Sequence, residues 1–341
     1  MSKQFDVCVV GPTTLVGETL LELLEARTFP IRNLVLAAPG ESDADPVIFR
    51  GEDYFVQRLE KVDFATCDLV FFCDTAAVAK EYVPKAVAGG AAVIDDSDAF
   101  RGRTDIPLVV PEINGETLDG FSASRIVASP NSCATIMALT LKPLQTAFGL
   151  NAVSAVTFQS VSGVGKAAVE ELAQQSMGLF NQQSVQPTLF PKQVAFNLLP
   201  QIGAVQADGA TREEHKIAEE TKHLLQNNNM HLDVTAVRVP VFYGHAVALH
   251  VATARSGEAE DAYEILKNAP GLAVYDMAEE GGYPTPVVEA AFNDPVLVGR
   301  IRVRSDALPG FNLWAVADNT RKGAALNMVQ IAEKLVEKYL T

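Results

Sequence analysis

Residues 5–24, FDVCVVGPTTLVGETLLELL, decide the fold of the first part of the chain. Residues 5–10 form an apolar run of strand length, residues 11–17 form a turn bounded by glycines, and leucines then recur with helical spacing. A strand, a glycine turn and a helix in this order open a dinucleotide-binding fold. We therefore expect a Rossmann-like dinucleotide-binding domain at the N-terminus.

The turn departs from the GxxGxxG pattern at its middle position, which is Thr14. A β-branched side chain stands where the pyrophosphate comes closest to the backbone, so the sequence supports the fold more strongly than the ligand. Residues 38–45 hold three acids and no base, which favours NAD over NADP, and a solvated acidic loop is the alternative. The turn predicts these cofactor-binding residues: Gly11, Thr13, Thr14, Leu15, Val16 and Gly17.

Strands and helices alternate through the rest of the first 130 residues. A helix is expected over residues 76–88, and the strands over residues 34–37, 67–72, 92–95, 108–111 and 125–128. This alternation is typical of an α/β fold in which helices wind around a parallel sheet.

After residue 150 the sequence pattern changes to long β-like runs separated by amphipathic helices, which indicates an α+β domain. The runs cover residues 152–161, 231–239, 246–254 and 312–317, and the helices residues 166–179 and 213–225. Residues 180–210, with weak periodicity, are interpreted as an ordered excursion that serves as a dimer arm. The domains are expected at residues 1–131 and 132–320, with a helix at 321–341 packing back on the first.

Composition and charge make some partners, locations and kinds of site unexpected for this chain. The chain has 341 residues, 48% of them hydrophobic, and a net charge of −15 without a basic block, so neither nucleic acid nor an anionic membrane is an expected partner. The first residues carry no hydrophobic leader and no run of eighteen apolar residues occurs, so a cytoplasmic location is expected. Four cysteines without CxxC spacing predict neither a disulfide framework nor a metal site.

The loop SPNSCA, residues 129–134, joins an expected strand to an expected helix. The first turn of a helix has unpaired N–H groups and a dipole that favours an anion, and a thiol there is readily ionised. Cys133 is therefore a candidate nucleophile. The alternative is that Cys133 is a small buried residue and Ser132 a helix cap.

Four further sets of residues carry candidate chemistry. Gln159 lies in TFQSVSGVG, Glu213 and Lys216 share a helical face, and Arg238 and His245 flank a turn. Arg101 precedes the stretch PLVVPEIN. Taken singly, each has an ordinary explanation as a strand-edge amide, a solvated ion pair, a core histidine or a surface cation.

Together and in this order, these motifs resemble the aspartate-semialdehyde dehydrogenase family over nearly the whole chain, as far as DNTRKGAA at residues 318–325. The resemblance implies NADPH-dependent reduction of aspartyl-4-phosphate in amino-acid biosynthesis. In that reaction a cysteine thiolate displaces phosphate, and hydride then reduces the thioester to the semialdehyde. It also implies a homodimer formed through the sheet of a substrate and dimerisation domain, and a small amino-acid-derived ligand.

The resemblance assigns roles by position. It implies that Gln159 orients the acyl intermediate and that His245 is the acid/base. Arg238 is implied to clamp the substrate carboxylate and Glu213 to meet its amine. The phosphate-binding set is Arg101, Asn131 and Lys216, and Thr75 and Asn319 join the cofactor-binding residues.

The nucleophile departs from the family pattern, Pro-Asn-Cys-Ser-Thr. Ungapped alignment puts Ser132 at the cysteine position and Cys133 one residue late, where a helix turns the side chain by about 100°. A serine hydroxyl is far less ionised than a thiol at neutral pH. Glyceraldehyde-3-phosphate dehydrogenases offer the opposite register, with Cys133 as nucleophile, but their histidine follows shortly after the cysteine, where this chain has Gln159 and Ser160.

The cofactor elements of the family are altered as well. The arginine expected after the second strand is missing from residues 38–42, and Asp74 and Thr75 stand where the family has small residues. The pattern resembles the Usg-type paralogues of the family. It leaves three hypotheses: a binding homodimer with lost or reduced activity, a dehydrogenase that uses Cys133 with NAD or NADP, and a hydrolase with Ser132 as nucleophile.

Overall fold

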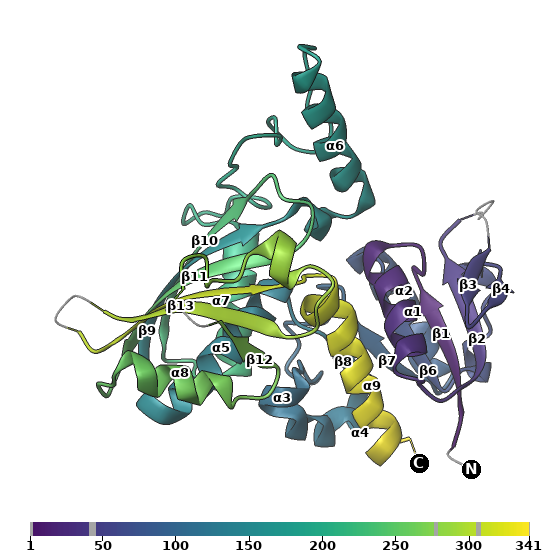
Figure 1. Cartoon of the computed structure of the whole chain (residues 1–341). Helices are drawn as coiled ribbons and strands as arrows, with labels where there is room; N and C mark the ends of the chain where they lie inside the picture. The colour runs from purple at the N-terminus through teal and green to yellow at the C-terminus, as the bar shows by residue number, and fades with distance from the viewer. Residues whose placement is uncertain (1–2, 41–45, 276–278, 305–307, 341) are drawn as a thin grey trace. The chain divides into compact units, whose positions relative to one another are not determined.

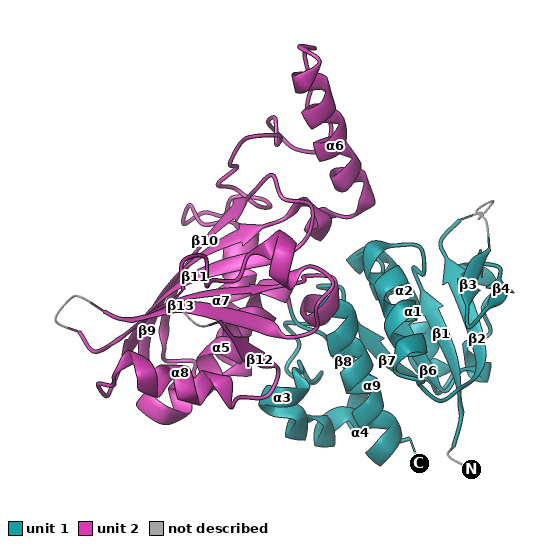
Figure 2. Cartoon of the chain, viewed as in Figure 1, with its two compact units in different colours: residues 1–130, 324–341 teal, residues 131–323 magenta. Residues whose placement is uncertain are grey.

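The computed structural model describes residues 3–40, 46–275, 279–304 and 308–340. The chain divides into two compact units, one of residues 1–130 and 324–341 and the other of residues 131–323 (Figure 2). The division falls at the start of a helix, between Pro130 and Asn131. The first unit therefore contains both ends of the chain.

The first unit is built on a parallel sheet with strand order β5-β2-β1-β6-β7-β8 (Figure 1). Its strands are β1 (Phe5–Val10), β2 (Ile31–Ala38), β5 (Gln57–Arg58), β6 (Leu69–Phe72), β7 (Ala92–Asp95) and β8 (Ile126–Ala128). Its longer helices are α1 (Leu15–Ala26), α2 (Ala76–Ala88) and α9 (Leu326–Lys338). A hairpin of β3 (Val47–Phe49) and β4 (Glu52–Tyr54), and short helices α3 (Pro111–Asn114) and α4 (Phe121–Ser124), complete it. The predicted Rossmann-like fold is confirmed.

The glycine turn between β1 and α1 works as the sequence predicts. Gly11 has a φ of +78°, and a Cβ there would lie 2.8 Å from the carbonyl oxygen of Cys73. A Cβ on Gly17 would lie 2.1 Å from the carbonyl oxygen of Gly11, so only glycine lets α1 start this close to the strand. The Thr14 hydroxyl caps the helix by accepting from the N–H of Gly17 at 3.0 Å.

The second unit has a mixed sheet in the order β10-β9-β11-β14-β13-β12, in which only the two edge pairs are parallel. The strands are β9 (Leu150–Gln159), β10 (His231–Arg238), β11 (His245–Thr253), β12 (Leu272–Val274), β13 (Val296–Val303) and β14 (Gly310–Ala317). Helices α5 (Ser132–Phe148), α7 (Arg212–Leu224) and α8 (Ala259–Lys267) pack together on it. This arrangement confirms the predicted α+β domain.

Helix α6 (Lys166–Phe180) extends away from this sheet (Figure 1). The following residues, 181–210, are all described and form no named helix or strand. They are held to α6 by buried side chains: Glu171 accepts hydrogen bonds from the N–H groups of Thr188 and Leu189, and Gln175 accepts from those of Val194 and Ala195. The excursion is therefore ordered by buried polar contacts.

One predicted strand is wrong. Residues 108–111 make only an isolated bridge, between Leu108 and Ala128, and Pro111 begins the short helix α3. Proline has no N–H for a sheet ladder, and its fixed φ suits the first helical position. The acidic residues 41–45, which carry most of the prediction of NAD over NADP, lie outside the described residues. Of the helices that the structure describes, none is long and apolar enough to cross a membrane.

Gly17→Ala should destabilise the first unit, because the new methyl group would overlap the backbone of Gly11. We expect the free energy of unfolding in urea to fall by about 1–3 kcal/mol. Gly102→Ala is the matched control, since nothing lies within 4 Å of a Cβ at that position. Equal unfolding midpoints for the two variants would contradict the tight helix–strand contact.

Candidate active site

The start of helix α5 is fixed by Asn131. Its side-chain oxygen accepts hydrogen bonds from the N–H groups of Cys133 (2.9 Å) and Ala134 (3.3 Å), which makes it the N-cap. Its own N–H donates to Glu220 at 2.6 Å, and its amide nitrogen donates to Glu213 at 2.9 Å. One residue thus caps α5 and ties it to two carboxylates of α7.

Glu213 brings most of the predicted substrate-binding residues together. Its Oε1 accepts from Asn131 and, at 3.4 Å, from the amide nitrogen of Gln159 at the end of β9. Lys216, one helical turn further along α7, places its Nζ 4.0 Å from Oε2. A capping box at Thr211 holds the N-terminus of α7 in place. The cluster joins a carboxylate, an ammonium group and two amides.

Arg238 ends β10 beside Gln159, its register partner on β9, and is 5% exposed. Its NH1 donates to the carbonyl oxygen of Ser160 at 2.6 Å. Burial lowers the pKa of Arg238, while the negative charge of Glu213 acts in the opposite direction. A buried guanidinium beside a carboxylate suits the binding of a small zwitterionic ligand.

His245 begins β11 and is buried. Its Nδ1 lies 3.0 Å from the hydroxyl oxygen and 3.2 Å from the backbone nitrogen of Ser160. Burial and the neighbouring Arg238 charge lower the pKa of His245 to about 3. The ring is therefore neutral at neutral pH.

Ser132 and Cys133 leave the helix in different directions. Ser132 is half-buried against Gly323, where a Cβ would come within 2.6 Å of the serine Cβ. Cys133 has no exposed surface. Burial and the Glu213 charge raise the pKa of the Cys133 thiol well above its usual value, and a hydrogen bond with Thr157 opposes this only in part. Desolvation thus outweighs the helix N-terminus, and the resting thiol is neutral.

Three side chains of this network are absent from the sequence-based prediction of the site: Thr157, Ser160 and Ser162. Strand alternation places Thr157 on the same face as Gln159, which was the available signal. Asn319, predicted to bind the cofactor, places its side-chain oxygen 3.1 and 3.0 Å from the hydroxyls of Ser160 and Ser162. No sequence signal pairs these residues, because their contact depends on which strands are neighbours.

The other predicted residues lie in the first unit. Arg101 donates to the carbonyl oxygen of Ser129 at 2.7 Å. Thr75 caps α2, and its N–H donates to the carboxylate of Asp74 at 2.6 Å. Among the described residues no group of three or more His, Cys, Asp or Glu could hold a metal ion.

The glycine turn offers a partial fit to a dinucleotide. The N–H groups of Leu15 and Val16 have no acceptor inside α1, so they and the helix dipole can bind a diphosphate. The Thr14 hydroxyl already occupies the N–H of Gly17. Asp74 follows β6, and its Cβ lies 3.3 Å from the position of a Cβ on Gly11, which brings a carboxylate close to the turn. The backbone N–H groups of the turn fit the diphosphate of such a cofactor, and the Asp74 side chain lies close to the turn.

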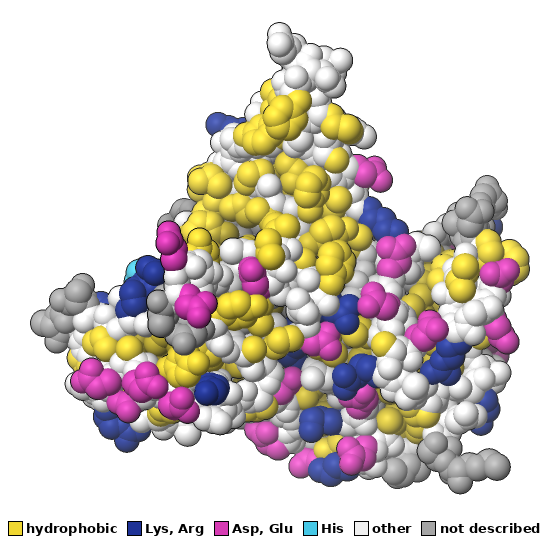
Figure 3. Space-filling model, in the orientation of Figure 1, with side chains coloured by type: hydrophobic (Ala, Val, Ile, Leu, Met, Phe, Trp, Pro, Cys, Tyr) yellow, Lys and Arg dark blue, Asp and Glu magenta, His cyan; other side chains and the backbone are white. Residues whose placement is uncertain are grey.

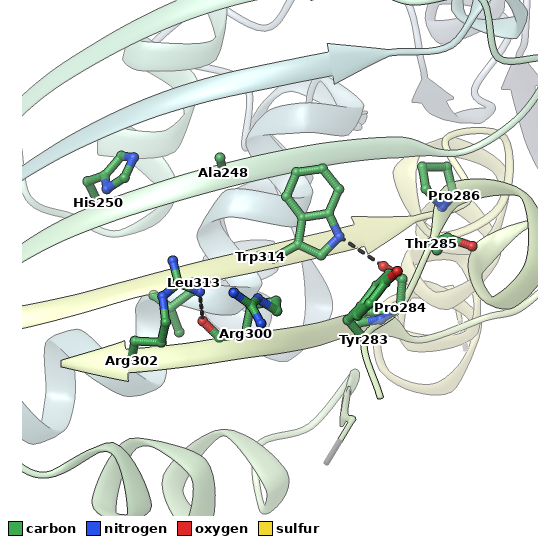
Figure 4. Close-up of a pocket in the computed structure, with 10 residues that line it drawn as sticks. All are labelled: Ala248, His250, Tyr283, Pro284, Thr285, Pro286, Arg300, Arg302, Leu313 and Trp314. Carbon is green, nitrogen blue, oxygen red and sulfur yellow. Dashed lines mark hydrogen bonds between the residues drawn. The ribbon is translucent and has the colours of Figure 1, made fainter. Parts of the chain in front are cut away.

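A separate groove of about 350 Å³ lies on the second unit's sheet, where Trp314 donates from Nε1 to the carbonyl oxygen of Pro284 at 2.9 Å (Figure 4). Its lining residues are Ala248, His250, Tyr283, Pro284, Thr285, Pro286, Arg300, Arg302, Leu313 and Trp314. They include none of the predicted site residues. The predicted site and this groove are distinct.

The two units correspond to two family models. Residues 6–121 match the model described as semialdehyde dehydrogenase, NAD binding domain, and residues 141–322 match semialdehyde dehydrogenase, dimerisation domain. The fold and the side-chain cluster thus define a two-domain protein of the semialdehyde dehydrogenase class.

Relatives narrow the class. The chain is 43% identical to the aspartate-semialdehyde dehydrogenase of Shewanella violacea, with 99% of this chain and 100% of that one covered, and 43% identical to that of Legionella pneumophila, with 100% and 98% covered. It is 41% identical to aspartate semialdehyde dehydrogenase II of Vibrio cholerae complexed with ASA, with a TM-score of 0.96 and 99% and 100% coverage. The chain belongs to the aspartate-semialdehyde dehydrogenase family.

Cys133 should not react with Ellman's reagent in the native protein at pH 8, because its thiol is buried and its pKa is raised. We expect Cys133→Ser to leave the native labelling rate unchanged and to remove one of the four thiols counted in denaturant. A fast native reaction that disappears in this variant would show that the thiol is accessible and ionised.

Proposed function

We propose that the chain is a homodimeric family member that binds aspartate semialdehyde or a close amino-acid-derived relative, and that its thiol-dependent dehydrogenase activity is lost or greatly reduced. The observation that carries the proposal is the start of α5, where Cys133 is fully buried and its half-buried neighbour Ser132 is the residue that ungapped alignment with the family pattern puts at the nucleophile position. Asn131, Gln159 and Lys216, to which the resemblance assigns roles in the site, nevertheless lie around Glu213.

The ligand class follows from the charges. Glu213 supplies a carboxylate for an ammonium group, and Arg238 supplies a guanidinium for a carboxylate, which together suit an α-amino acid. Asn131 and Lys216 lie beside Glu213 and would bind a second anionic group of the ligand. The Vibrio cholerae relative is complexed with ASA, which supports a small-molecule ligand for this chain.

The proposed loss of activity rests on the chemistry of oxygen and sulfur. A serine hydroxyl at residue 132 needs a base to become a nucleophile. His245 is neutral, but its Nδ1 is already engaged by Ser160. A serine ester would also accept hydride less readily than a thioester, so both halves of the family reaction are weakened.

NAD or NADP would be the hydride donor or acceptor if one is bound. The N–H groups of Leu15 and Val16 at the first turn of α1 would hold its diphosphate. Exposed Thr13 and Thr75 lie at the N-terminal ends of α1 and α2 and would border it. The Asp74 carboxylate favours weak binding, since it adds negative charge beside the glycine turn.

A second candidate function, an active dehydrogenase that uses Cys133, is supported by Thr157. This hydroxyl hydrogen-bonds the Cys133 thiol and also contacts the amide nitrogen of Gln159 at 3.3 Å. The sulfur therefore shares a partner with the side chain that the family resemblance implies for orienting an acyl group. A small rebuilding of the first turn of α5 would be needed to expose it.

The homodimer is supported by the dimerisation-domain match and by exposed apolar side chains. Phe180 at the end of α6 is 79% exposed and Phe196 on the excursion is 64% exposed, and their rings meet at 5.5 Å. Hydrophobic side chains gather over α6 and the surface next to it (Figure 3). An apolar surface of this kind marks a protein interface.

Exchanging two side chains tests the lost nucleophile. Ser132→Cys combined with Cys133→Ser restores the family order, and we expect it to raise phosphate-dependent reduction of NADP or NAD by aspartate semialdehyde by at least about a hundredfold, because a thiolate replaces a hydroxyl. Wild type and Cys133→Ser should be equally poor. Nucleotide affinity is measured by titration on each protein, so that an inactive variant without cofactor is recognised. Wild-type turnover that disappears in Cys133→Ser would favour the second candidate.

Phe180→Asp together with Phe196→Asp should convert the dimer into a monomer, since two charges would be buried in the proposed interface. Sedimentation velocity at micromolar concentration measures the change. Phe55→Asp, at a 76% exposed position of the first unit, is the matched control and should leave the dimer intact. A dimer that survives the double substitution would place the interface elsewhere.

A further inference from the structure

The ends of three neighbouring strands bring several polar residues of the second unit together. β11 lies between β9 and β14 and runs antiparallel to both, so its first residue meets the last residues of its neighbours. His245 is in register with Ala317, and Ser160 directly follows β9. Ser160, His245 and Asn319 are therefore adjacent although they are far apart in sequence.

Asn319 anchors this network through its side-chain oxygen. Oδ1 accepts from the backbone N–H of Gly244 at 3.1 Å, and it lies 3.0 Å from the Ser162 hydroxyl and 3.1 Å from the Ser160 hydroxyl. A backbone N–H can only donate, so the atom that faces Gly244 must be the amide oxygen. Ser162 and the residue before His245 are thus held by one buried acceptor.

The same reasoning fixes the proton on the imidazole. The N–H of Ser160 points at Nδ1 of His245 across 3.2 Å, so Nδ1 must offer a lone pair and a neutral ring carries its proton on Nε2. We propose that Ser160 is a positioning residue that holds His245 in the Nε2–H form, so that the ring donates a hydrogen bond to a ligand oxygen instead of taking a proton from residue 132. The Ser160 hydroxyl lies 3.0 Å from Nδ1 and 3.1 Å from Oδ1 of Asn319, and in this form it donates its one proton to Nδ1, which leaves the Ser162 hydroxyl as the donor to Asn319.

The surroundings of Nε2 agree with a donor role. A Cβ on the exposed residue Gly163 would lie 3.1 Å from Nε2 and 3.3 Å from NH1 of Arg238, so both donors lie beside Gly163. Burial and the Arg238 charge keep the ring neutral, because they lower the pKa of His245 to about 3. Two adjacent donors suit an oxygen that carries or develops negative charge. The ligand part of this inference rests on the proposed function.

Nitrogen NMR of the full-length protein labelled with ¹⁵N-histidine tests the tautomer without any ligand. His245→Gln identifies the His245 signals among the five histidines. We expect a protonated Nε2 and an unprotonated Nδ1 for His245 that do not change between pH 5 and pH 8. A proton on Nδ1, or an imidazolium at pH 7, would overturn the proposal.

Two variants test separate parts of the proposal. One asks whether the backbone N–H or the hydroxyl of Ser160 fixes the tautomer, and the other asks whether a ligand must reach Nε2. Ser160→Ala keeps the N–H and should keep the tautomer, and a switch to the Nδ1–H form would overturn the assignment to the backbone. Gly163→Ala should keep the tautomer but block Nε2, because its methyl group would crowd the ring. Val164→Ala, at a 51% exposed position, is its control.

Addition of aspartate semialdehyde, with calorimetry on the same sample, tests the donor role. We expect the Nε2 signals to shift in the wild type and in Val164→Ala, and to stay unchanged in Gly163→Ala. Binding without a wild-type shift would overturn donation by His245. Absence of binding would instead contradict the proposed ligand, and the tautomer measurements would then decide the role of Ser160 by themselves.

Discussion

The hydrogen bonds of Asn131 determine how helix α5 begins, and the directions of the side chains in its first turn follow from them. The same residue caps α5 and donates to Glu213 and Glu220 on α7, so the turn cannot rotate without breaking contacts between the two helices. Successive residues on a helix point about 100° apart. Ser132 therefore packs beside Gly323, while Cys133 enters the space next to Thr157. A thiol moved by one residue has a different environment.

Burial shifts the pKa values of three site residues, in each case toward the uncharged form. It raises the pKa of Cys133 and lowers those of His245 and Arg238, which in each case favours the uncharged form. Arginine keeps its charge because its ordinary pKa is far above neutrality. The Cys133 thiol and the His245 imidazole are uncharged at neutral pH. The result is a fixed positive charge beside two neutral groups, an arrangement better suited to holding an anionic oxygen than to moving protons between side chains.

Local pattern predicted much of the fold and less of the site. Helix 76–88 and strand 92–95 have the expected bounds because their apolar spacing and flanking residues are local features. The predicted strand at residues 108–111 is wrong because an apolar run before a proline is typical both of a strand and of the residues that precede a helix. The contacts of Ser160 with His245 and Asn319 could not be predicted, because they depend on the antiparallel pairing of β11 with β9 and β14.

The presence of Arg238 and Glu213 has a physical explanation that does not depend on catalytic turnover. Arg238 is buried, and the Glu213 charge acts on it, so removal of either side chain would leave the other inadequately compensated. Such a loss typically costs about 3–5 kcal/mol. Glu213 also receives hydrogen bonds from Asn131 and Gln159, so its removal would disturb α5 and β9 as well. The Ser132 side chain takes part in none of these contacts. Arg238 and Glu213 therefore stabilise the second unit whatever the chemistry of residue 132, so their presence is not by itself evidence for catalysis.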